Sequence, residues 1–217
     1  MSGKIFLGYD AREAVGFHVC VESIIKHARY PFTLSPLHGA RRDGTNDFTY
    51  ARFMIPYLCR YTGSALFIDG SDMFLREDIA EIFKFYDPAK AVSVVKHNYR
   101  TRHPRKYLGT ELEADNRDYP RKNWSSVVMF NCAHPANAML TPQYIESYNG
   151  AHLHGFHWLS DNDIGEIDPR WNVLIGEDDD DKDCALAHFT LGIPSFPRYT
   201  ACRYADEWLQ TFDRMTR

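Results

Sequence analysis

The stretch ALFIDGSD, residues 65–72, contains the clearest buried strand of the chain and decides its fold. Its first four residues are apolar, which is typical of a short strand buried in a sheet. The strand then ends in Asp69-Gly70-Ser71-Asp72, so that two carboxylates and a glycine stand at its carboxyl end. This position is informative because ligands of α/β proteins bind beyond the carboxyl ends of the strands.

Apolar runs and segments with helical periodicity alternate on both sides of this strand. Further strands are predicted at residues 5–8, 33–37, 91–95 and 127–130, and helices at 12–28, 48–61 and 79–85. Pro56 lies inside the second helix and predicts a kink or an early end there. This alternation predicts an α/β fold with a mostly parallel central sheet flanked by helices. A length of 217 residues suits one domain spanning residues 1–217.

The composition is that of an ordinary globular protein, with 44% hydrophobic and 25% charged residues. A formal net charge of -4 argues against a dedicated nucleic-acid-binding protein, which normally carries a surplus of basic residues. No apolar stretch reaches the ~20 residues of a membrane-spanning helix, and the first ten residues predict a strand rather than a signal peptide. Five cysteines without a CxxC pair fit reduced thiols, so we expect a cytoplasmic protein.

Asp69 and Asp72 are candidate ligands of a divalent cation. Hard cations prefer oxygen ligands and bridge protein carboxylates to the phosphate oxygens of a substrate. Gly70 lets the backbone turn tightly, so that both carboxylates converge. The alternative is an ordinary turn, in which Asp72 or Ser71 caps the next segment. Asp10, at the end of the strand predicted at 5–8, lies at the same edge of the sheet and either binds a ligand or caps the following helix.

The segment ALFIDGSDMFLREDI, residues 65–79, resembles the strand and metal motif of glycosyltransferases with the GT-A fold, and most closely that of the family 8-like group. The pattern of that group is an apolar strand, Asp-x-Asp, an apolar stretch and Asp-Ile, and Asp78-Ile79 stands at the matching distance from Asp72. Asp69 departs from the pattern, because it stands one residue further from Asp72 than usual. The resemblance implies a GT-A-type nucleotide-diphospho-sugar transferase fold.

Other segments between Lys4 and Pro197 resemble motifs of the same family, in the same order. IFLGYD at 5–10 is similar to the strand that meets the nucleotide, TYAR at 49–52 to the helix that carries an arginine toward it, and WSSVVMFN at 124–131 to the strand bordering the sugar pocket. DND at 161–163, with Trp171-Asn172 downstream, resembles the acidic donor-sugar motif, and AHFTLG at 187–192 the segment that returns a histidine to the metal. The implied nucleotide-sugar-binding residues are Tyr9, Asp10, Arg12, Arg52, Asp69, Gly70, Ser71, Asn131 and Gly192.

The resemblance implies a metal-dependent enzyme that transfers a sugar from a nucleoside diphosphate sugar, with a UDP-sugar as the first expectation, to a hydroxyl acceptor. Mn²⁺ or Mg²⁺ would be held by Asp69, Asp72 and His188, because imidazole together with carboxylates suits manganese. The alternative for His188 is a hydrogen-bonded structural role at the end of a strand. Asp163, with Asp161 as its rival, is the implied catalytic residue that contacts the sugar hydroxyls.

Two other functions stay open: a nucleotidyltransferase that makes sugar nucleotides, and a non-catalytic nucleotide- or carbohydrate-binding module. The first typically has a Gly-rich loop with Lys or Arg after its first strand, which GYDAREA at 8–14 lacks. No determinant of the sugar, the acceptor or the oligomeric state is visible in the sequence.

A basic side chain is also expected to neutralise the diphosphate. The late lysine of the family is absent from Gly192-Ile-Pro-Ser195, so another cation must do this work. The long loop at 97–122 is one candidate if it folds over the metal site, since such loops are usually functional or disordered, and the alternative is that its basic residues form a solvated face. Its basic residues are Arg100, Arg102, Arg105, Lys106, Arg121 and Lys122. The acidic run at 177–183 predicts a solvated turn.

Overall fold

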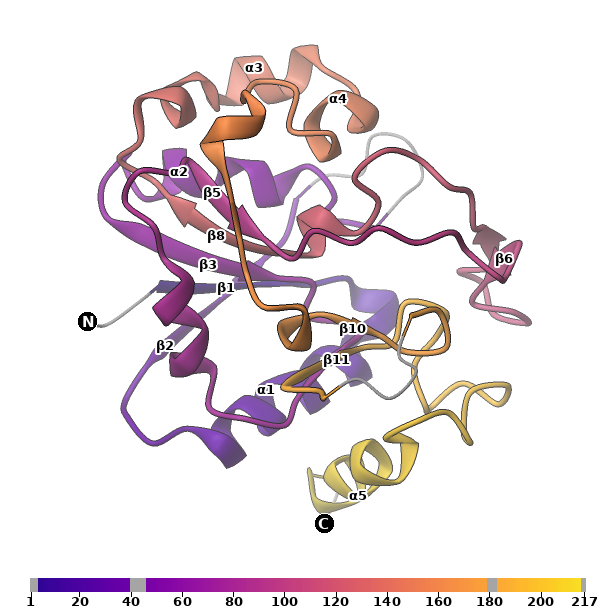
Figure 1. Ribbon diagram of the computed structural model, residues 1–217. Helices are drawn as coiled ribbons and strands as arrows, with labels where there is room; N and C mark the ends of the chain where they lie inside the picture. Colours follow the sequence, from indigo (N-terminus) through magenta and orange to yellow (C-terminus); the bar gives the residue numbers. More distant parts are fainter. Residues whose placement is uncertain (1–3, 40–45, 179–182, 216–217) are drawn as a thin grey trace.

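The computed structural model describes residues 4–39, 46–178 and 183–215, which form an α/β fold around a six-stranded sheet (Figure 1). The strand order is β2-β1-β3-β8-β5-β9. The strands are β1 (Lys4–Gly8), β2 (Thr33–Leu37), β3 (Ser64–Ile68), β5 (Val92–Val94), β8 (Val127–Asn131) and β9 (Ile164–Glu166). All of them run in one direction except β8, which is antiparallel to β3 and β5. The prediction of an α/β fold with a mostly parallel sheet is therefore confirmed.

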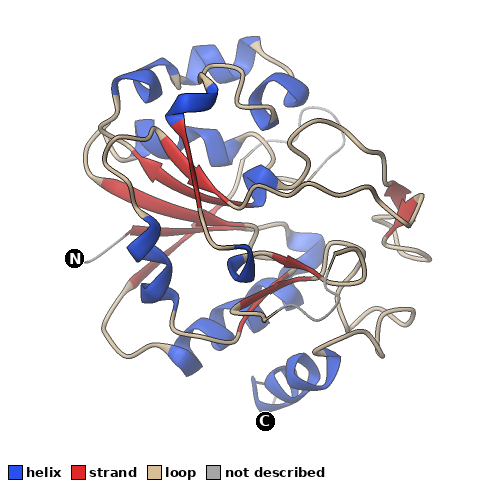
Figure 2. Cartoon of the chain, viewed as in Figure 1, coloured by secondary structure: helices blue, strands red, loops and turns tan. Residues whose placement is uncertain are grey.

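Helices cover both faces of this sheet (Figure 2). On one face lie α1 (Ala14–His27) and, packed against it, α5 (Ala205–Met215); on the other lie α2 (Ile55–Leu58), α3 (Pro142–Ser147) and α4 (Gly150–His154). The 3-10 helices are η1 (Ala11–Glu13), η2 (Ala51–Met54), η3 (Ile79–Phe85), η4 (Trp124–Ser126), η5 (Pro135–Met139), η6 (Asp161–Asp163) and η7 (Pro169–Trp171). Among the described helices, none is long and apolar enough to cross a membrane.

The central strand β3 is buried on both faces, which explains its unbroken apolar sequence. Successive side chains of a strand point to opposite faces of the sheet. Phe67 accordingly packs into one core with Phe53, while Leu66 and Ile68 pack into a second core with Phe17 of α1. Burying each of these side chains contributes about 2 kcal/mol, so β3 anchors both layers and holds the residues that follow it in place.

A small second sheet continues the chain beyond β3. It has the order β10-β11-β4, with β4 (Met73–Leu75), β10 (Val173–Leu174) and β11 (Leu186–His188). Because β11 pairs antiparallel with β4, His188 lies opposite Met73. This pairing brings a residue from near the C-terminus next to the end of the Asp69–Asp72 turn.

Two predicted elements differ from the structure. The helix predicted at 48–61 is divided into η2 and α2, and Pro56 lies in the first turn of α2 instead of ending a helix. A proline fits there because the amide groups of the first helical turn have no partner within the helix. The loop at 97–122 contains a short antiparallel pair, β6 (Arg105–Lys106) with β7 (Ala114–Asp115).

The acidic run at 177–183 is not simply the solvated turn that was predicted. Glu177 is only 2% exposed and accepts hydrogen bonds from the Thr101 hydroxyl, the Asn116 amide and the backbone N–H of Arg102. It thereby ties the long loop to the body of the protein. Residues 179–182 of this run lie outside the described residues.

Candidate metal centre

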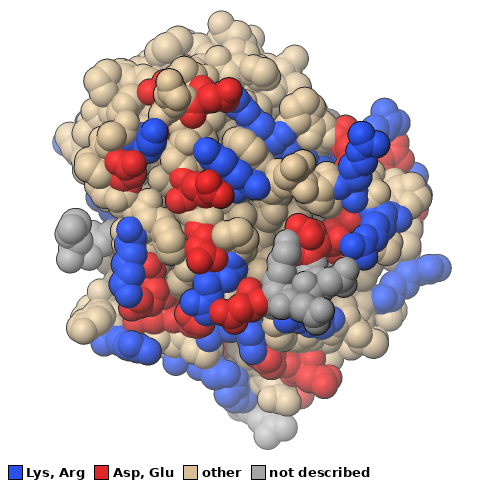
Figure 3. All heavy atoms as spheres, viewed as in Figure 1, with Lys and Arg blue, Asp and Glu red and all other residues tan. Residues whose placement is uncertain are grey.

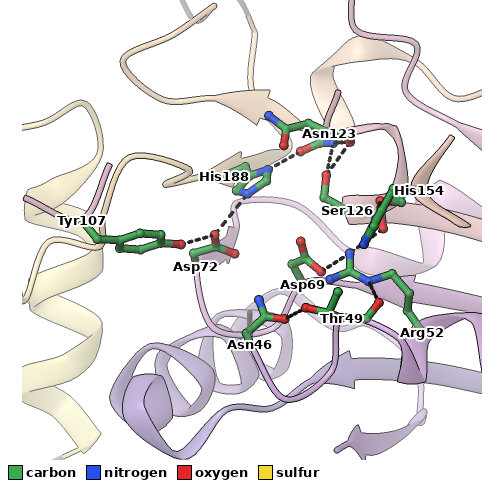
Figure 4. A network of polar contacts seen from close by, with 12 residues as sticks. Asn46, Thr49, Arg52, Asp69, Asp72, Tyr107, Asn123, Ser126, His154 and His188 are labelled. Atoms are coloured by element: carbon green, nitrogen blue, oxygen red, sulfur yellow. Dashed lines mark hydrogen bonds and ion pairs between the residues drawn. The ribbon is translucent and has the colours of Figure 1, made fainter. Parts of the chain in front are cut away.

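Three side chains that could hold a metal ion meet at the carboxyl end of β3. Asp69, Asp72 and His188 each offer one ligand atom, and these atoms all lie within 4.8 Å of one another. His188 Nε2 is 3.2 Å from Asp72 Oδ2. Figure 4 shows the three side chains directed toward one another from separate parts of the chain. Asp72 and His188 are buried, and the Asp69 side chain is 14% exposed.

Tight backbone packing sets the course of the 69–72 turn. A Cβ atom at Gly70 would stand 2.5 Å from the carbonyl oxygen of Gly8, and one at Gly16 of α1 would stand 1.9 Å from the carbonyl oxygen of Ser71. Gly70 has no positive φ, so close approach to β1, and not a left-handed turn, is the reason for glycine at this position. The turn is thus held between the first strand and the start of the first helix.

Arg52 is directed at Asp69. Its Nη1 lies 2.7 Å from Asp69 Oδ1 and donates a hydrogen bond to the Ser125 carbonyl at 2.8 Å. The guanidinium is buried against the neighbouring rings of Phe48 and Phe67, at 5.2 and 4.8 Å from their centres. Burial raises the pKa of Asp69 to about 6, although the charge of Arg52 opposes that shift. Arg52 therefore stabilises the ionised form of Asp69.

His188 has partners on both ring nitrogens. Nδ1 lies 3.0 Å from Asn172 Oδ1, and the Asn172 amide nitrogen donates to Ser126 Oγ at 2.8 Å. The carbonyl of Ser126 accepts from the backbone N–H of Asp69 at 2.9 Å, which links His188 to the backbone of Asp69 through Asn172 and Ser126. Partners of this kind orient a ligand imidazole and set which nitrogen is free to bind metal.

Asp72 is held in its ionised form by its neighbours. Burial by itself would raise the pKa of Asp72, but the charge of His188 and the hydrogen bond to it outweigh burial and lower the pKa. The hydroxyl of Tyr107 also donates to Asp72 Oδ2, at 3.2 Å. Tyr107 belongs to the long loop, and the length of that loop was the only signal in the sequence that pointed to this residue.

Glu13 is a second residue that sequence reasoning missed, because it looked like an ordinary residue in the first turn of a helix. It is 4% exposed, and among the described residues its Oε1 has no hydrogen-bond partner. Burial, together with the charge of Asp72, raises the pKa of Glu13 to about 8. Glu13, Arg12, Lys106 and Tyr107 line a cavity of about 260 Å³.

Asp10 takes the capping role that the sequence left open. Its carboxylate accepts from the backbone N–H and the side chain of Arg12 and from the backbone N–H of Asp47. Tyr9 packs edge-on against Phe17, with ring centres 5.1 Å apart. Tyr9 thus follows β1 at the same edge of the sheet as Asp69, as the sequence predicted, while Asp10 and Arg12 bond to each other.

Three predicted site residues lie apart from the centre. Asn131 pairs with Ser64 at the start of β3, and the backbone of Asp163 bonds to Ala91 just before β5. The five residues of β3, about 16 Å at 3.3 Å per residue, separate this end of the sheet from Asp69.

Both aspartates before β9 have partners of their own. Asp163 accepts from Ser160, and Asp161 is an exposed residue that pairs with Arg121. Asn131, Asp161 and Asp163 make no bond to the centre in the part of the chain that the structure describes.

Gly192 belongs to the segment that contacts the long loop. Its φ of 151° is one that side chains rarely adopt, and a Cβ atom there would lie 2.4 Å from the Tyr199 ring. The carbonyl of the preceding Leu191 accepts from the backbone N–H of Tyr107 at 2.6 Å. The segment after His188 thus positions the residue that contacts Asp72.

The surface on the face shown in Figure 3 carries basic and acidic side chains interspersed. A mixed surface of this kind fits the net charge of -4.

A curated plant protein is similar to the chain over nearly its whole length. Protein CDI of Arabidopsis thaliana is 35% identical over 227 aligned residues, which cover 97% of this chain and 86% of the relative. No protein-family model matches the chain.

Solved structures of glycosyltransferases share the fold at low sequence identity. An active-site mutant of LgtC has a TM-score of 0.62 and 11% identity, covering 96% of this chain and 94% of LgtC. GlyE of Streptococcus pneumoniae TIGR4 has a TM-score of 0.64 and 12% identity, covering 98% of this chain and 60% of GlyE. The bifunctional glycosyltransferase WbbM has a TM-score of 0.62 and 17% identity over 97% of this chain, which spans about half (49%) of WbbM. These likenesses show the GT-A-type fold.

Proposed function

The chain belongs to the family of Protein CDI, and we propose that it transfers a sugar from a nucleoside diphosphate sugar to a hydroxyl acceptor with the help of a divalent cation. One observation carries the proposal: Asp69, Asp72 and His188 converge at the carboxyl end of β3. In an α/β sheet this is where ligands bind. The glycosyltransferase fold then makes sugar transfer the first reaction to test.

The chemistry of the three side chains fits a cation. Two carboxylates and one imidazole are an oxygen and nitrogen donor set suited to Mn²⁺, and Mg²⁺ is the alternative. Among the described residues, Asp72 Oδ1 is buried without a hydrogen-bond partner, as expected of an oxygen that awaits a cation. When bound, the cation supplies Lewis-acid stabilisation of the negative charge on the diphosphate.

Two further residues position the cation ligands. Arg52 favours the ionised form of Asp69, and Asn172 orients His188, so both are positioning residues. We further propose a UDP-sugar donor, a family 8-like origin and one glycosyltransferase domain over residues 1–217. LgtC has been crystallised with donor and acceptor sugar analogues, which makes it a useful template for these tests.

Residues outside the metal centre are proposed to contact the nucleotide-sugar donor. Asp163 or Asp161 would contact the sugar hydroxyls, with Asn131 beside them, while Tyr9 and Asp10 would meet the nucleoside. For Asp161 and Asp163 this requires the donor sugar, or a movement of η6, to span the gap to the centre. Replacing either aspartate with asparagine would test this by the change in kcat.

Calorimetry of UDP binding, with and without Mn²⁺, tests the proposal. We expect binding that requires Mn²⁺ in the wild type and is lost in Asp72→Ala, with Asp168→Asn, an exposed residue that caps η7, as the control. Metal-dependent release of UDP from a UDP-sugar would support transfer. Pyrophosphate chemistry would support a nucleotidyltransferase instead, and binding that is unchanged in Asp72→Ala would refute the metal assignment.

A further inference from the structure

The basic residues of the 97–122 loop are not equivalent in the structure. Arg100 and Arg102 are exposed on the surface. Three others are bonded to acidic or amide side chains: Arg105 to Glu113 and Asp115, Arg121 to Asp161, and Lys122 to Asn116. Lys106 differs from all of them. Among the described residues, no hydrogen bond or ion pair joins its ammonium group, which lies 5.2 Å from the centre of the Tyr107 ring.

Lys106 lines a cavity together with Tyr107, the residue that contacts Asp72. Neighbouring residues of a strand point to opposite sides, and in β6 Arg105 pairs with the acids of its own hairpin while Lys106 lines the cavity of about 260 Å³ with Glu13 and Tyr107. Tyr107, which lines the same cavity, donates a hydrogen bond to Asp72 Oδ2. The cavity that Lys106 lines is therefore next to the cation ligands.

The position of Lys106 is set by the residue that follows it. Tyr107 is buried, its hydroxyl bonds to Asp72 and its N–H to the Leu191 carbonyl, and its φ is 56°. A bulky residue in this left-handed region is strained, so the surrounding contacts must hold it there. These contacts anchor the loop at Tyr107 and keep the ammonium group beside the centre.

The other cations near the centre already have partners. Arg52 pairs with Asp69, and Arg12 pairs with Asp10. A diphosphate brings more negative charge than one divalent cation neutralises, and a lysine ammonium binds phosphate oxygens as a compact point charge.

We infer that Lys106 binds the diphosphate of the nucleotide, in the place left without a lysine at Gly192-Ile-Pro-Ser195. The inference rests on the proposed function, because it assumes that a nucleoside diphosphate occupies the cavity beside the cation. Lys106 would hold the phosphates of the donor and of the product, while Asp69, Asp72 and His188 hold the cation.

The test compares Lys106→Met with Arg117→Gln, a charge loss at an exposed arginine of the same loop that pairs with Asp115 and does not line the cavity. UDP and GDP binding are measured by calorimetry with saturating Mn²⁺ at low and high salt, and Mn²⁺ binding alone by electron paramagnetic resonance. We expect Lys106→Met to weaken nucleotide binding about tenfold or more, to reduce its salt dependence and to leave Mn²⁺ affinity within about twofold. Lys106→Arg should retain most of the affinity, and Arg117→Gln all of it.

The outcomes separate the two proposals. A wild type that binds neither nucleotide with Mn²⁺ overturns the proposed function and this inference together. Wild-type binding that Lys106→Met leaves unchanged, with the same salt dependence, overturns the inference alone. Should Lys106→Met fail to fold, Lys106→Gln and the salt dependence of Lys106→Arg decide in the same way.

Discussion

At the scale of single residues, the histidine of the centre is oriented before any cation binds. Asn172 is completely buried, and its Oδ1 accepts a hydrogen bond from His188 Nδ1. This contact fixes the ring so that Nε2 lies 3.2 Å from Asp72 Oδ2, to which it is hydrogen-bonded, and a bound cation would take the place of the proton on Nε2. A structural histidine and a ligand histidine would both have an acceptor on Nδ1, but only the ligand needs Nε2 beside carboxylates.

Asn172→Ala should therefore weaken Mn²⁺ binding about 10- to 100-fold, which is the usual effect of losing a residue that orients a metal ligand. Asn172→Asp keeps an acceptor for Nδ1 and should bind more tightly than Asn172→Ala. Electron paramagnetic resonance of free Mn²⁺ measures both, with circular dichroism to establish folding. A folded Asn172→Ala protein with wild-type affinity would contradict this role.

Glu13 makes stability depend on pH. Its pKa is about 8 in the folded protein and has its ordinary value of 4.5 in the unfolded chain, so between these values the folded state binds more protons. Stability conferred by the protonated carboxyl is complete below about pH 4.5 and is lost as the pH rises toward 8.

Glu13→Gln removes this loss, because glutamine stays neutral. In urea unfolding with EDTA, the variant should gain stability over the wild type between pH 5 and pH 8, by at most about 1.4 kcal/mol per pH unit. The amide is a fair mimic of the protonated carboxyl, so the two proteins should be similar at pH 5. If the free energies of unfolding of Glu13→Gln and the wild type differ by the same amount at pH 5 and at pH 8, Glu13 is not buried in its protonated form.

At the scale of elements, the start of α1 supports the turn that carries the carboxylates. Gly16 lies against the carbonyl of Ser71, which stands between Asp69 and Asp72. No side chain fits into that contact. The helix and the turn are thus a single packing unit, and their separation would displace the cation ligands.

Gly16→Ala should destabilise the protein by about 3 kcal/mol and weaken Mn²⁺ binding, since the new methyl group collides with backbone that cannot move alone. Gly63→Ala is a suitable comparison: its φ is 66° but a Cβ there meets nothing within 4 Å. It should cost about 1 kcal/mol and leave Mn²⁺ binding intact. Urea unfolding and Mn²⁺ titration of both variants test this, and a Gly16→Ala protein as stable as Gly63→Ala would show the packing argument to be wrong.

At the scale of the whole molecule, the candidate ligands join two sheets. Asp69 follows β3 of the central sheet, whereas His188 ends β11 of the small sheet. A cation held by both would bind the folded state only, because the unfolded chain cannot keep these segments together. Binding and folding are therefore linked.

Mn²⁺ at about 100 times its Kd should stabilise the protein by about 2.7 kcal/mol. For a chain of this size the corresponding rise in Tm is about 5 to 10 °C. Thermal unfolding followed by circular dichroism measures it, with EDTA as the control. His188→Ala should unfold at a Tm that Mn²⁺ leaves unchanged, and an equal rise in that variant would mean that the cation binds elsewhere.

Patterns of neighbouring residues in the sequence were sufficient to predict most strands and helices and the carboxylates at the end of β3. Four apolar residues before Asp69 predicted the strand, because burial on both faces leaves no room for polar side chains. The same reasoning failed for Pro56, since a proline inside an apolar run is compatible both with the end of one helix and with the start of another. Glu13 and Tyr107 gave no local sign of burial beside the centre.

The sequence by itself determined that carboxylates stand at a strand end and that a histidine ends a later strand. Tertiary structure alone decided that these side chains meet, and that Asn131 and Asp163 lie at the other end of the sheet. The physical reason is that apolar periodicity depends on neighbours along the chain, whereas contacts across 116 residues, such as that of Asp72 with His188, depend on which strands pair and in what register.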